Sequence, residues 1–389
     1  MEAVRARRAR GDAFIDLTES NPTRAGFDYP SDLLAPLGDA RGLRYAPSPL
    51  GTIDARRAVA ADYARQGIEV PPERIALTAS TSDGYSLLFK LLADAGDEVL
   101  VPRPSYPLFE HLTRLDLLVP RHYDLDPHGD WAIDFAGLEE AITPRTRAVL
   151  VVSPNNPTGS FIAAAELDRL AAICAPRGIA IIADEVFADY ELTPGAAARA
   201  GRLVGGLAGD GLKTVSCDDV LSFTLGGLSK SIGLPQVKLG WMAVGGPGAL
   251  VTPALERLEL ICDTYLAVST PVQLAAAHLL SRGAAVRSQI STRIAANYRT
   301  LRTRAAGASS CRALSSDGGW YAVLQVPSLE PEEDLVLRLL DDGVLTHPGY
   351  FFDFPRASFL ILSLLPPEAS FADGVSRVLR HFDCTVSGI

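Results

Sequence analysis

The feature that most constrains the fold of this sequence lies between residues 45 and 245, where short apolar runs alternate with segments of helical spacing. Such a βα alternation is typical of a mainly parallel sheet with helices on both faces. Ligands of such sheets bind at the carboxyl ends of the strands, so functional residues are expected there. The expected strands are residues 74–78, 98–102, 148–153, 179–183, 220–224 and 241–244, and the expected helices are residues 82–93, 108–115 and 163–174.

After residue 248 the sequence becomes mainly helical in pattern. The Ser-Thr-Pro at residues 269–271 favours the start of a helix. Apolar residues at near-helical spacing over residues 286–301 predict a long amphipathic helix. The remainder, from about residue 305, mixes helical segments with two expected strands, at residues 319–326 and 359–363.

A chain of 389 residues is too long for one simple core, so two domains are expected. We predict an α/β fold with a large domain, a mainly parallel sheet covered by helices, over residues 45–285. A smaller α+β domain would combine the N-terminal segment, residues 1–44, with the C-terminal residues 286–389.

Composition argues against several classes of partner. The formal net charge of −10 disfavours a general nucleic-acid surface. No apolar run approaches the roughly 20 residues needed to span a bilayer, and the N-terminus lacks the apolar core of a secretory signal. The five cysteines are widely spaced without a CxxC motif, which gives no zinc pattern and suits a reducing compartment. We therefore expect a cytoplasmic protein without a membrane, nucleic-acid or metal partner.

The expected strand ends carry groups that suit a phosphate and a flat ring. Ser80, Thr81 and Ser82 open a helix, whose free N–H groups and positive dipole end attract anions such as phosphate; a simple serine N-cap is the alternative. Tyr106, in the next strand-end loop, could stack on a ring or be packing. Asn156, in SPNNPTG, could aim its amide into a site or only form a turn.

Two ionisable residues complete this set. Asp184 follows an apolar run, and a buried carboxylate needs a cationic partner, such as a protonated ring nitrogen or an arginine. Lys230 is one of only four lysines in the chain, whereas arginine supplies the other 32 basic residues. Lysine, unlike arginine, can lose its proton and form a Schiff base. A phosphate cradle, a stacking ring, an aimed amide, a buried carboxylate and a nucleophilic lysine together predict pyridoxal 5'-phosphate.

The ordered motifs TASTS, RPSYP, SPNNPTG, ADEVFADY and GLSKSIGLPQVKLGW also resemble a known family. They are similar to those of the class I and II aminotransferases, pyridoxal-phosphate enzymes of fold-type I that include aspartate aminotransferase. The resemblance begins at ESNPT (residues 19–23) and YAPSPLG (residues 45–51) and continues to GGWY (residues 318–321) and HPGYFF (residues 347–352). It therefore covers most of the chain.

This resemblance implies a role for each matching residue. Lys230 would be the Schiff-base lysine, Asp184 would pair with the pyridinium nitrogen, and Asn156 would bond the ring hydroxyl. Tyr106 would stack on the ring, and Tyr45 would reach the phosphate of a neighbouring subunit, which implies a homodimer with shared sites. The other expected cofactor-binding residues are Ser80, Thr81, Ser82, Phe187, Ser229 and Lys238.

Several positions depart from the family pattern. Phe187 replaces a tyrosine that donates to the ring hydroxyl, a bond worth roughly 1.5–3 kcal/mol; unless another donor takes its place, the Schiff base should be more basic than usual. Lys238 replaces an arginine on the phosphate, and Gly227 replaces a serine. Ile361 stands where the family has the arginine that clamps the substrate α-carboxylate.

The resemblance leaves two enzymatic functions open. The first is an aminotransferase that moves an amino group between an amino donor and a carbonyl acceptor. The second uses the same Cα carbanion for elimination, replacement, cyclisation or decarboxylation, as in aminocyclopropane-carboxylate synthases. Because isoleucine cannot bind a carboxylate, Arg24 is the first candidate for that role and Arg356 the second, although both could be surface arginines. Asn21 is the remaining expected substrate-binding residue. A non-catalytic DNA-binding regulator is disfavoured by the acidic charge.

Overall fold

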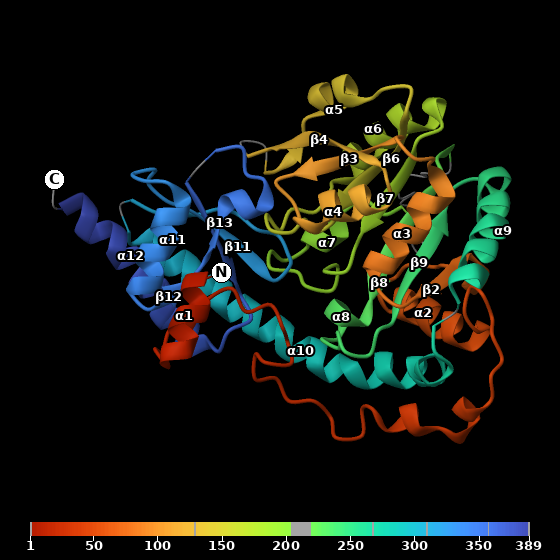
Figure 1. The fold of residues 1–389 in the computed structure, drawn as a ribbon, viewed down its shortest axis with the longest axis horizontal. Helices are drawn as coiled ribbons and strands as arrows, with labels where there is room; N and C mark the ends of the chain where they lie inside the picture. The colour runs from red at the N-terminus through yellow and green to blue at the C-terminus, as the bar shows by residue number, and fades with distance from the viewer. Residues whose placement is uncertain are drawn as a thin grey trace.

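The computed structural model describes residues 2–127, 130–203, 219–266, 268–308, 310–356 and 358–387. Its centre is an eight-stranded sheet with the order β2-β9-β8-β7-β6-β3-β4-β5 (Figure 1). These strands are β2 (Ile75–Thr78), β3 (Glu98–Arg103), β4 (Val119–Asp126), β5 (Ala132–Ile133), β6 (Thr146–Val152), β7 (Ala180–Asp184), β8 (Ser222–Gly227) and β9 (Gly240–Gly245).

The pairing within this sheet confirms the predicted α/β fold. Strands β8, β7, β6, β3 and β4 run parallel to one another, whereas β9 is antiparallel to both β2 and β8, and β5 is antiparallel to β4. All residues of β7 and β8 are buried, which explains why these central strands read as nearly continuous apolar or small-residue runs. The carboxyl ends of the parallel strands, and the amino end of β9, therefore meet along one rim.

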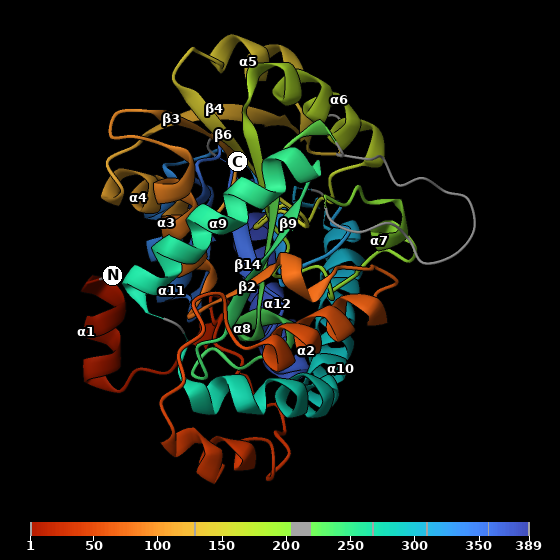
Figure 2. The ribbon, with the colours of Figure 1, turned by 90° about the vertical axis from the view of Figure 1, so that its right-hand side faces the viewer.

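Helices cover both faces of the large sheet (Figure 2). Helix α3 begins after Ser80, whose hydroxyl caps the Asp83 N–H, and buries Leu88 and Phe89. It packs with α4 and α9 in one apolar cluster, while α2, α5, α6 and α10 contribute to clusters that contain the alternate residues of the strands. The bounds are α2 (Ile53–Arg65), α3 (Thr81–Leu92), α4 (Leu108–Leu115), α5 (Phe135–Ala141), α6 (Ala164–Cys174), α7 (Ala196–Arg199), α8 (Leu228–Ser231), α9 (Gly248–Tyr265) and α10 (Thr270–Ala306).

A second sheet, of four strands with the order β10-β11-β14-β13, lies at the other end of the molecule (Figure 1). The long helix α10, predicted from its apolar spacing, links the two parts. A two-stranded pair, β1 with β12, joins the N-terminal segment to the C-terminal part. The elements here are α1 (Glu2–Arg10), β1 (Ile15–Asp16), β10 (Arg312–Ala313), β11 (Tyr321–Gln325), α11 (Glu332–Asp341), β12 (Val344–Leu345), β13 (His347–Pro348), β14 (Phe359–Ser363) and α12 (Glu368–Ser387).

These two sheets support a division of the chain into a large domain over residues 45–285 and a small domain from residues 1–44 and 286–389, which we propose. The N-terminal segment touches both parts. The Leu17 carbonyl accepts from the Ser363 N–H, 2.7 Å away, on the small sheet. Leu33 instead packs in an apolar cluster with α2 and the first half of α10.

Within the described residues, no single helix has both the length and the apolar composition to cross a bilayer. Only α9 and α10, taken together as a sharply bent pair, meet these two criteria.

Candidate active site

Lys230 lies in the short helix α8, directly after the carboxyl end of β8. Its amine nitrogen is 5.7 Å from the ring centroid of Phe187 and 5.1 Å from that of Trp320. Burial lowers the pKa of this amine, and the opposing effect of the Asp184 carboxylate is the smaller of the two. A larger fraction of Lys230 is therefore unprotonated near neutral pH than for a lysine in water, as a nucleophile requires.

Asp184 ends the central strand β7 and is buried. Its Oδ2 accepts from the Tyr85 hydroxyl at 3.1 Å, and its Oδ1 accepts from the Val186 N–H at 3.1 Å. Burial raises the pKa of this carboxyl to about 6, although both hydrogen bonds and Lys230 favour the ionised form. A cation beside Asp184 would relieve this cost, so the site fits a protonated ring nitrogen.

The two neighbouring asparagines after β6 differ sharply in their contacts. Asn155 accepts from the Ser105 hydroxyl at 3.0 Å and donates to the Pro104 carbonyl and the Thr158 hydroxyl, so its amide holds the loop together. Asn156 is also buried, but its Oδ1 has no hydrogen-bond partner among the residues that the structure describes. An orphaned buried acceptor is costly, and the hydroxyl of a bound ring would satisfy it.

A close-packed cradle lies at the start of α3. A Cβ atom added to Gly240 would lie 2.9 Å from the Ser80 carbonyl carbon, and one added to Gly227 would lie 3.3 Å from Gly240 Cα. Lys238, with a φ of 62°, is exposed and lines a cavity of about 360 Å³ together with Thr78, Ala79 and Asp83. The helix N-terminus and this ammonium group together fit a phosphate.

The three hydroxyl residues at this cradle are not equivalent. The Ser80 oxygen accepts from the Asp83 N–H at 3.1 Å, as an N-cap, which was the alternative considered from the sequence. A capping hydroxyl keeps its own proton for donation. Thr81 and Ser82 are half-buried in the first turn, and Ser229 is half-buried in α8.

Aromatic residues at the start of β11 lie beside Phe187, and one of them, Trp320, also covers the Lys230 amine. Trp320 and Tyr321 lie 5.2 and 6.5 Å from the Phe187 ring, centroid to centroid. Burial raises the pKa of Tyr321 to about 12, while a hydrogen bond with Ser20 opposes the rise, which places the ESNPT loop beside this wall. Ile361 is fully buried in β14, opposite Val323, in an apolar cluster. No carboxylate-binding group is present at that position.

The other expected site residues are more exposed than Lys230 or make contacts outside its immediate surroundings. Tyr106 is 38 % exposed and contacts Phe109 edge to face at 5.8 Å; burial and the nearby Asp184 raise its pKa. Asn21 is half-buried and accepts from the Thr23 N–H and hydroxyl, which stabilises the turn before Arg24. The remaining residues, Tyr45, Arg24 and Arg356, are exposed, and no described contact brings them to Lys230.

Sequence reasoning missed three aromatic residues of this site. Tyr85 donates to Asp184, Trp320 covers the Lys230 amine, and the Tyr190 hydroxyl donates to the Lys230 carbonyl at 2.6 Å. Tyr85 follows the phosphate-site hydroxyls by one helical turn, and Tyr190 ends the ADEVFADY motif. Their positions within these motifs were the only available signal.

Comparison with known proteins identifies the family. Residues 14–368 match the sequence model of the family described as aminotransferase class I and II. The chain belongs to this family. This aminotransferase is 28% identical over 399 residues to alanine aminotransferase of Mycobacterium tuberculosis, covering 95% of this chain and 86% of that protein. It is 30% identical over 270 residues to the glutamate-pyruvate aminotransferase of Escherichia coli, covering 68% and 62%.

A solved structure agrees with this fold. The aminotransferase superposes on alanine aminotransferase from Pyrococcus furiosus with a TM-score of 0.84. The match has 23% sequence identity and covers 98% of this chain and 95% of the other. The predicted fold class, a mainly parallel large sheet with a smaller α+β part, is therefore that of the aminotransferase fold.

Proposed function

We propose that this aminotransferase uses pyridoxal 5'-phosphate, held covalently by Lys230, to move an amino group between an amino donor and a carbonyl acceptor. The observation that carries this proposal is a buried amine near a buried carboxylate whose pKa is raised, with an orphaned acceptor at the carboxyl end of the neighbouring strand β6. Lys230 and Asp184 are close enough for each to shift the pKa of the other. The open acceptor of Asn156 suits the ring hydroxyl.

The residues of the chain would divide the work of holding this cofactor. Asp184 would keep the ring nitrogen protonated, Asn156 would accept from the ring hydroxyl, and Tyr106 would cover one face of the ring. The N-terminus of α3, with Ser80, Thr81, Ser82, Ser229 and Lys238, would hold the phosphate. Bound in this way, pyridoxal phosphate supplies an electron sink for negative charge at the substrate Cα. Phe187 would offer this ring no hydrogen-bonding group.

Lys230 would also move the Cα proton. An amine whose pKa is lowered by burial can accept a proton near neutral pH and return it. Trp320 and Phe187, which lie against this amine, would exclude water from the transfer. Arg24, in the turn that Asn21 stabilises, is our first candidate for the cation that binds a substrate carboxylate, and Arg356 is the second.

We further propose a cytoplasmic homodimer with shared active sites and without a membrane or nucleic-acid partner. Tyr45 is 77 % exposed and Leu43 is 91 % exposed, and both lie in a segment that could reach a second subunit. Leu266, on the cavity that Lys238 lines, is 70 % exposed. Burial of these side chains by a second copy would place Tyr45 at a neighbouring phosphate site.

The visible spectrum of the purified protein during addition of amino donors tests this function. Because the relatives are alanine and glutamate-pyruvate aminotransferases, the donor panel should begin with alanine and glutamate. A spectral change that a 2-oxo acid reverses is expected. No change with any donor would contradict transamination.

A second candidate function has one observation in its favour, the buried Ile361 in the place of the carboxylate arginine. Without that clamp, the Cα carbanion could be used for elimination, replacement, cyclisation or decarboxylation. The same titration separates the two functions. Turnover in which the original spectrum returns after each cycle, without any oxo acid, would favour this second chemistry.

A further inference from the structure

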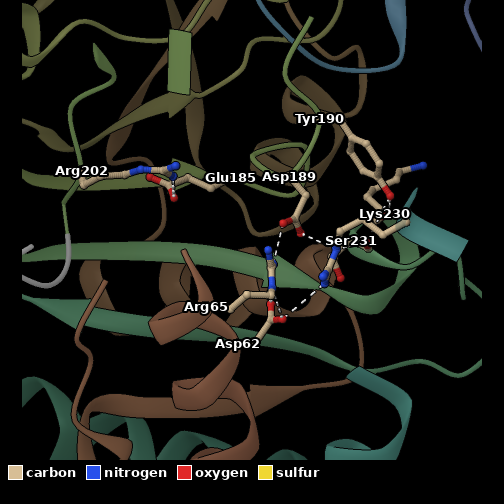
Figure 3. Close-up of polar contacts among 9 residues, drawn as sticks. Asp62, Arg65, Glu185, Asp189, Tyr190, Arg202, Lys230 and Ser231 are labelled. Atoms are coloured by element: carbon tan, nitrogen blue, oxygen red, sulfur yellow. Dashed lines mark hydrogen bonds and ion pairs between the residues drawn. The ribbon is translucent and has the colours of Figure 1, made fainter. Parts of the chain in front are cut away.

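A buried cluster of charges lies beside the segment that carries Lys230 (Figure 3). We call Asp62, Arg65, Asp189 and Arg287 the charge cluster. Arg287 is 3.3 Å from Asp62 and 3.2 Å from Asp189, and Arg65 is 3.0 Å from Asp62 and 2.6 Å from Asp189. Each arginine therefore bridges both carboxylates. Asp62, Asp189 and Arg287 are buried, and their charges, with that of Arg65, sum to zero.

The charge cluster is hydrogen-bonded to the backbone beside Lys230. Arg287 donates through Nε to the Ser231 carbonyl at 2.9 Å. Tyr190, adjacent to Asp189, donates to the Lys230 carbonyl at 2.6 Å and to the Ser231 carbonyl at 3.1 Å (Figure 3). The Lys230 carbonyl also accepts from the backbone N–H of Gly233, at 3.3 Å. Side chains from α10 and the loop after β7 therefore add to the backbone hydrogen bonds of this four-residue helix.

These contacts connect three separate elements to one short segment. Asp62 and Arg65 come from α2, Arg287 comes from α10, and Asp189 and Tyr190 follow β7. Together with Glu185 and Ser231, the carboxylates line a cavity of about 20 Å³, and the buried Ser231 hydroxyl has no described partner. The volume suffices for one water molecule.

Stability alone is a poor explanation for such a cluster. Desolvation of buried ion pairs costs about as much as their attraction returns, and an apolar cluster of similar volume would often be at least as stable. Ion pairs do, however, fix the orientation of their side chains. The planar guanidinium of Arg287 donates to the Asp62 carboxylate and to the Ser231 carbonyl, and its Nε lies 3.2 Å from Asp189. A fixed carbonyl direction at residues 230 and 231 in turn fixes where the Lys230 side chain leaves the backbone.

We propose that Tyr190 and the charge cluster are positioning residues that hold the backbone of Lys230 so that its amine stays against Phe187 and Trp320. The proposal rests on the proposed function, in which that amine holds the cofactor. Asp184 is the charged group that faces the amine itself; Tyr190 and the charge cluster act only through the backbone. Loss of the contact would let water reach the amine and raise its pKa toward the ordinary value of lysine.

Tyr190→Phe in the full-length, cofactor-loaded protein tests this proposal. The change deletes one hydroxyl and keeps the ring, which is buried against Trp320. Tyr123→Phe is the matched control, because the buried Tyr123 hydroxyl also donates to a backbone carbonyl, that of Leu150, at 2.7 Å, but away from α8. The readouts are the pH midpoint of the visible absorbance of the bound cofactor, the melting temperature, and the separate changes in kcat and KM.

The expected result is an upward shift of the pH midpoint by about half a unit or more in Tyr190→Phe, and no shift in Tyr123→Phe. A fall in kcat larger than the change in KM should accompany it. Asp189→Asn, which leaves both arginines with a neutral partner, should shift the midpoint in the same direction. The proposal is overturned if the melting temperature falls by the same amount in both tyrosine variants and neither variant shifts the pH midpoint. The role of Tyr190 would then be only structural.

A second measurement separates this proposal from the proposed function. If the unmodified protein shows no absorbance of a covalently held cofactor, the cofactor assignment fails. The pH dependence of labelling of the Lys230 amine by an acylating reagent, followed by peptide mass spectrometry, still reports its pKa. An upward shift in Tyr190→Phe relative to Tyr123→Phe would support positioning, and identical profiles would refute it.

Discussion

The two walls around Lys230 differ in kind. The wall from the large sheet presents two polar groups. Burial raises the pKa of Asp184, and the Oδ1 of Asn156 has no hydrogen-bond partner among the described residues. The wall from the small-sheet side is apolar, with the buried Trp320 lying 5.1 Å from the Lys230 amine. Under the proposed function, the large-sheet wall would supply the partners of a ring cofactor. Ile361 occupies the place where the family resemblance implies a carboxylate-binding arginine, so other residues would have to bind the substrate carboxylate.

Removal of the amine should have the largest effect. Lys230→Ala should lower turnover by at least about 10³-fold, because both the nucleophile and the proton carrier are lost. Lys90→Ala is the control, since the Lys90 amine bonds Ser86 and Asp116, neither of which is a proposed site residue. Steady-state rates with the donor found by titration would measure both. Equal losses in the two variants would remove Lys230 from the chemistry.

The buried apolar position Ile361 in β14 can be tested by an arginine. Ile361→Arg should destabilise the protein by about 3–5 kcal/mol, because the position is fully buried and offers no partner for the charge. Ile361→Met, which keeps the volume, should cost less than about 1.5 kcal/mol. Urea unfolding measures both. An Ile361→Arg variant that stays stable and binds amino donors more tightly would show that this position can face the substrate.

The neighbouring asparagines compare structural with functional polar groups. Asn155→Ala should lower the free energy of unfolding by about 1–3 kcal/mol, because it leaves buried partners unpaired. Asn156→Ala should leave the unfolding of the cofactor-free protein almost unchanged and weaken cofactor binding by about tenfold or more. Unfolding curves and cofactor titrations should be measured on both variants. A loss of stability in Asn156→Ala with a loss of cofactor affinity in Asn155→Ala would contradict these assignments.

The pH dependence of the free energy of unfolding tests whether the pKa of Asp184 is raised by burial. A carboxyl whose pKa is raised to about 6 contributes stability below its unfolded value, and this contribution is lost as the pH rises through 6. We therefore compare the free energy of unfolding of Asp184→Asn with that of the parent protein, both without cofactor. The difference should shift in favour of the variant by about 1–2 kcal/mol between pH 5 and pH 7.5, because only the parent loses stability over this range. If the difference in the free energy of unfolding is constant across this range, the pKa of Asp184 is not raised.

Much of the fold could be predicted because its central strands are buried on both faces. The strands β3, β6, β7 and β9 match the apolar runs to within two residues. Strand β4 was not predicted, because its VPRHYDLD sequence has no continuous apolar run and alternates apolar with polar residues only in its second half. Such an alternation indicates a half-buried strand only when it continues over several residues.

The site was predictable to the extent that its residues fall on strand ends. Asp184 and Lys230 lie close together because β7 and β8 are neighbouring parallel strands. Tyr190 and the charge cluster could not be predicted, since their contacts join α2, α10 and the loop after β7 across more than 200 residues of sequence. Only the folded arrangement brings such pairs together.

The central claim is that Lys230 holds the cofactor, and one measurement tests it most directly. Borohydride reduction of the loaded protein, followed by peptide mass spectrometry, would locate the attached cofactor among the four lysines of the chain. We predict that the added mass lies on the peptide that contains Lys230 and is absent after prior exposure to an effective amino donor. Added mass on Lys90, Lys213 or Lys238 alone, or on no lysine, would contradict this account.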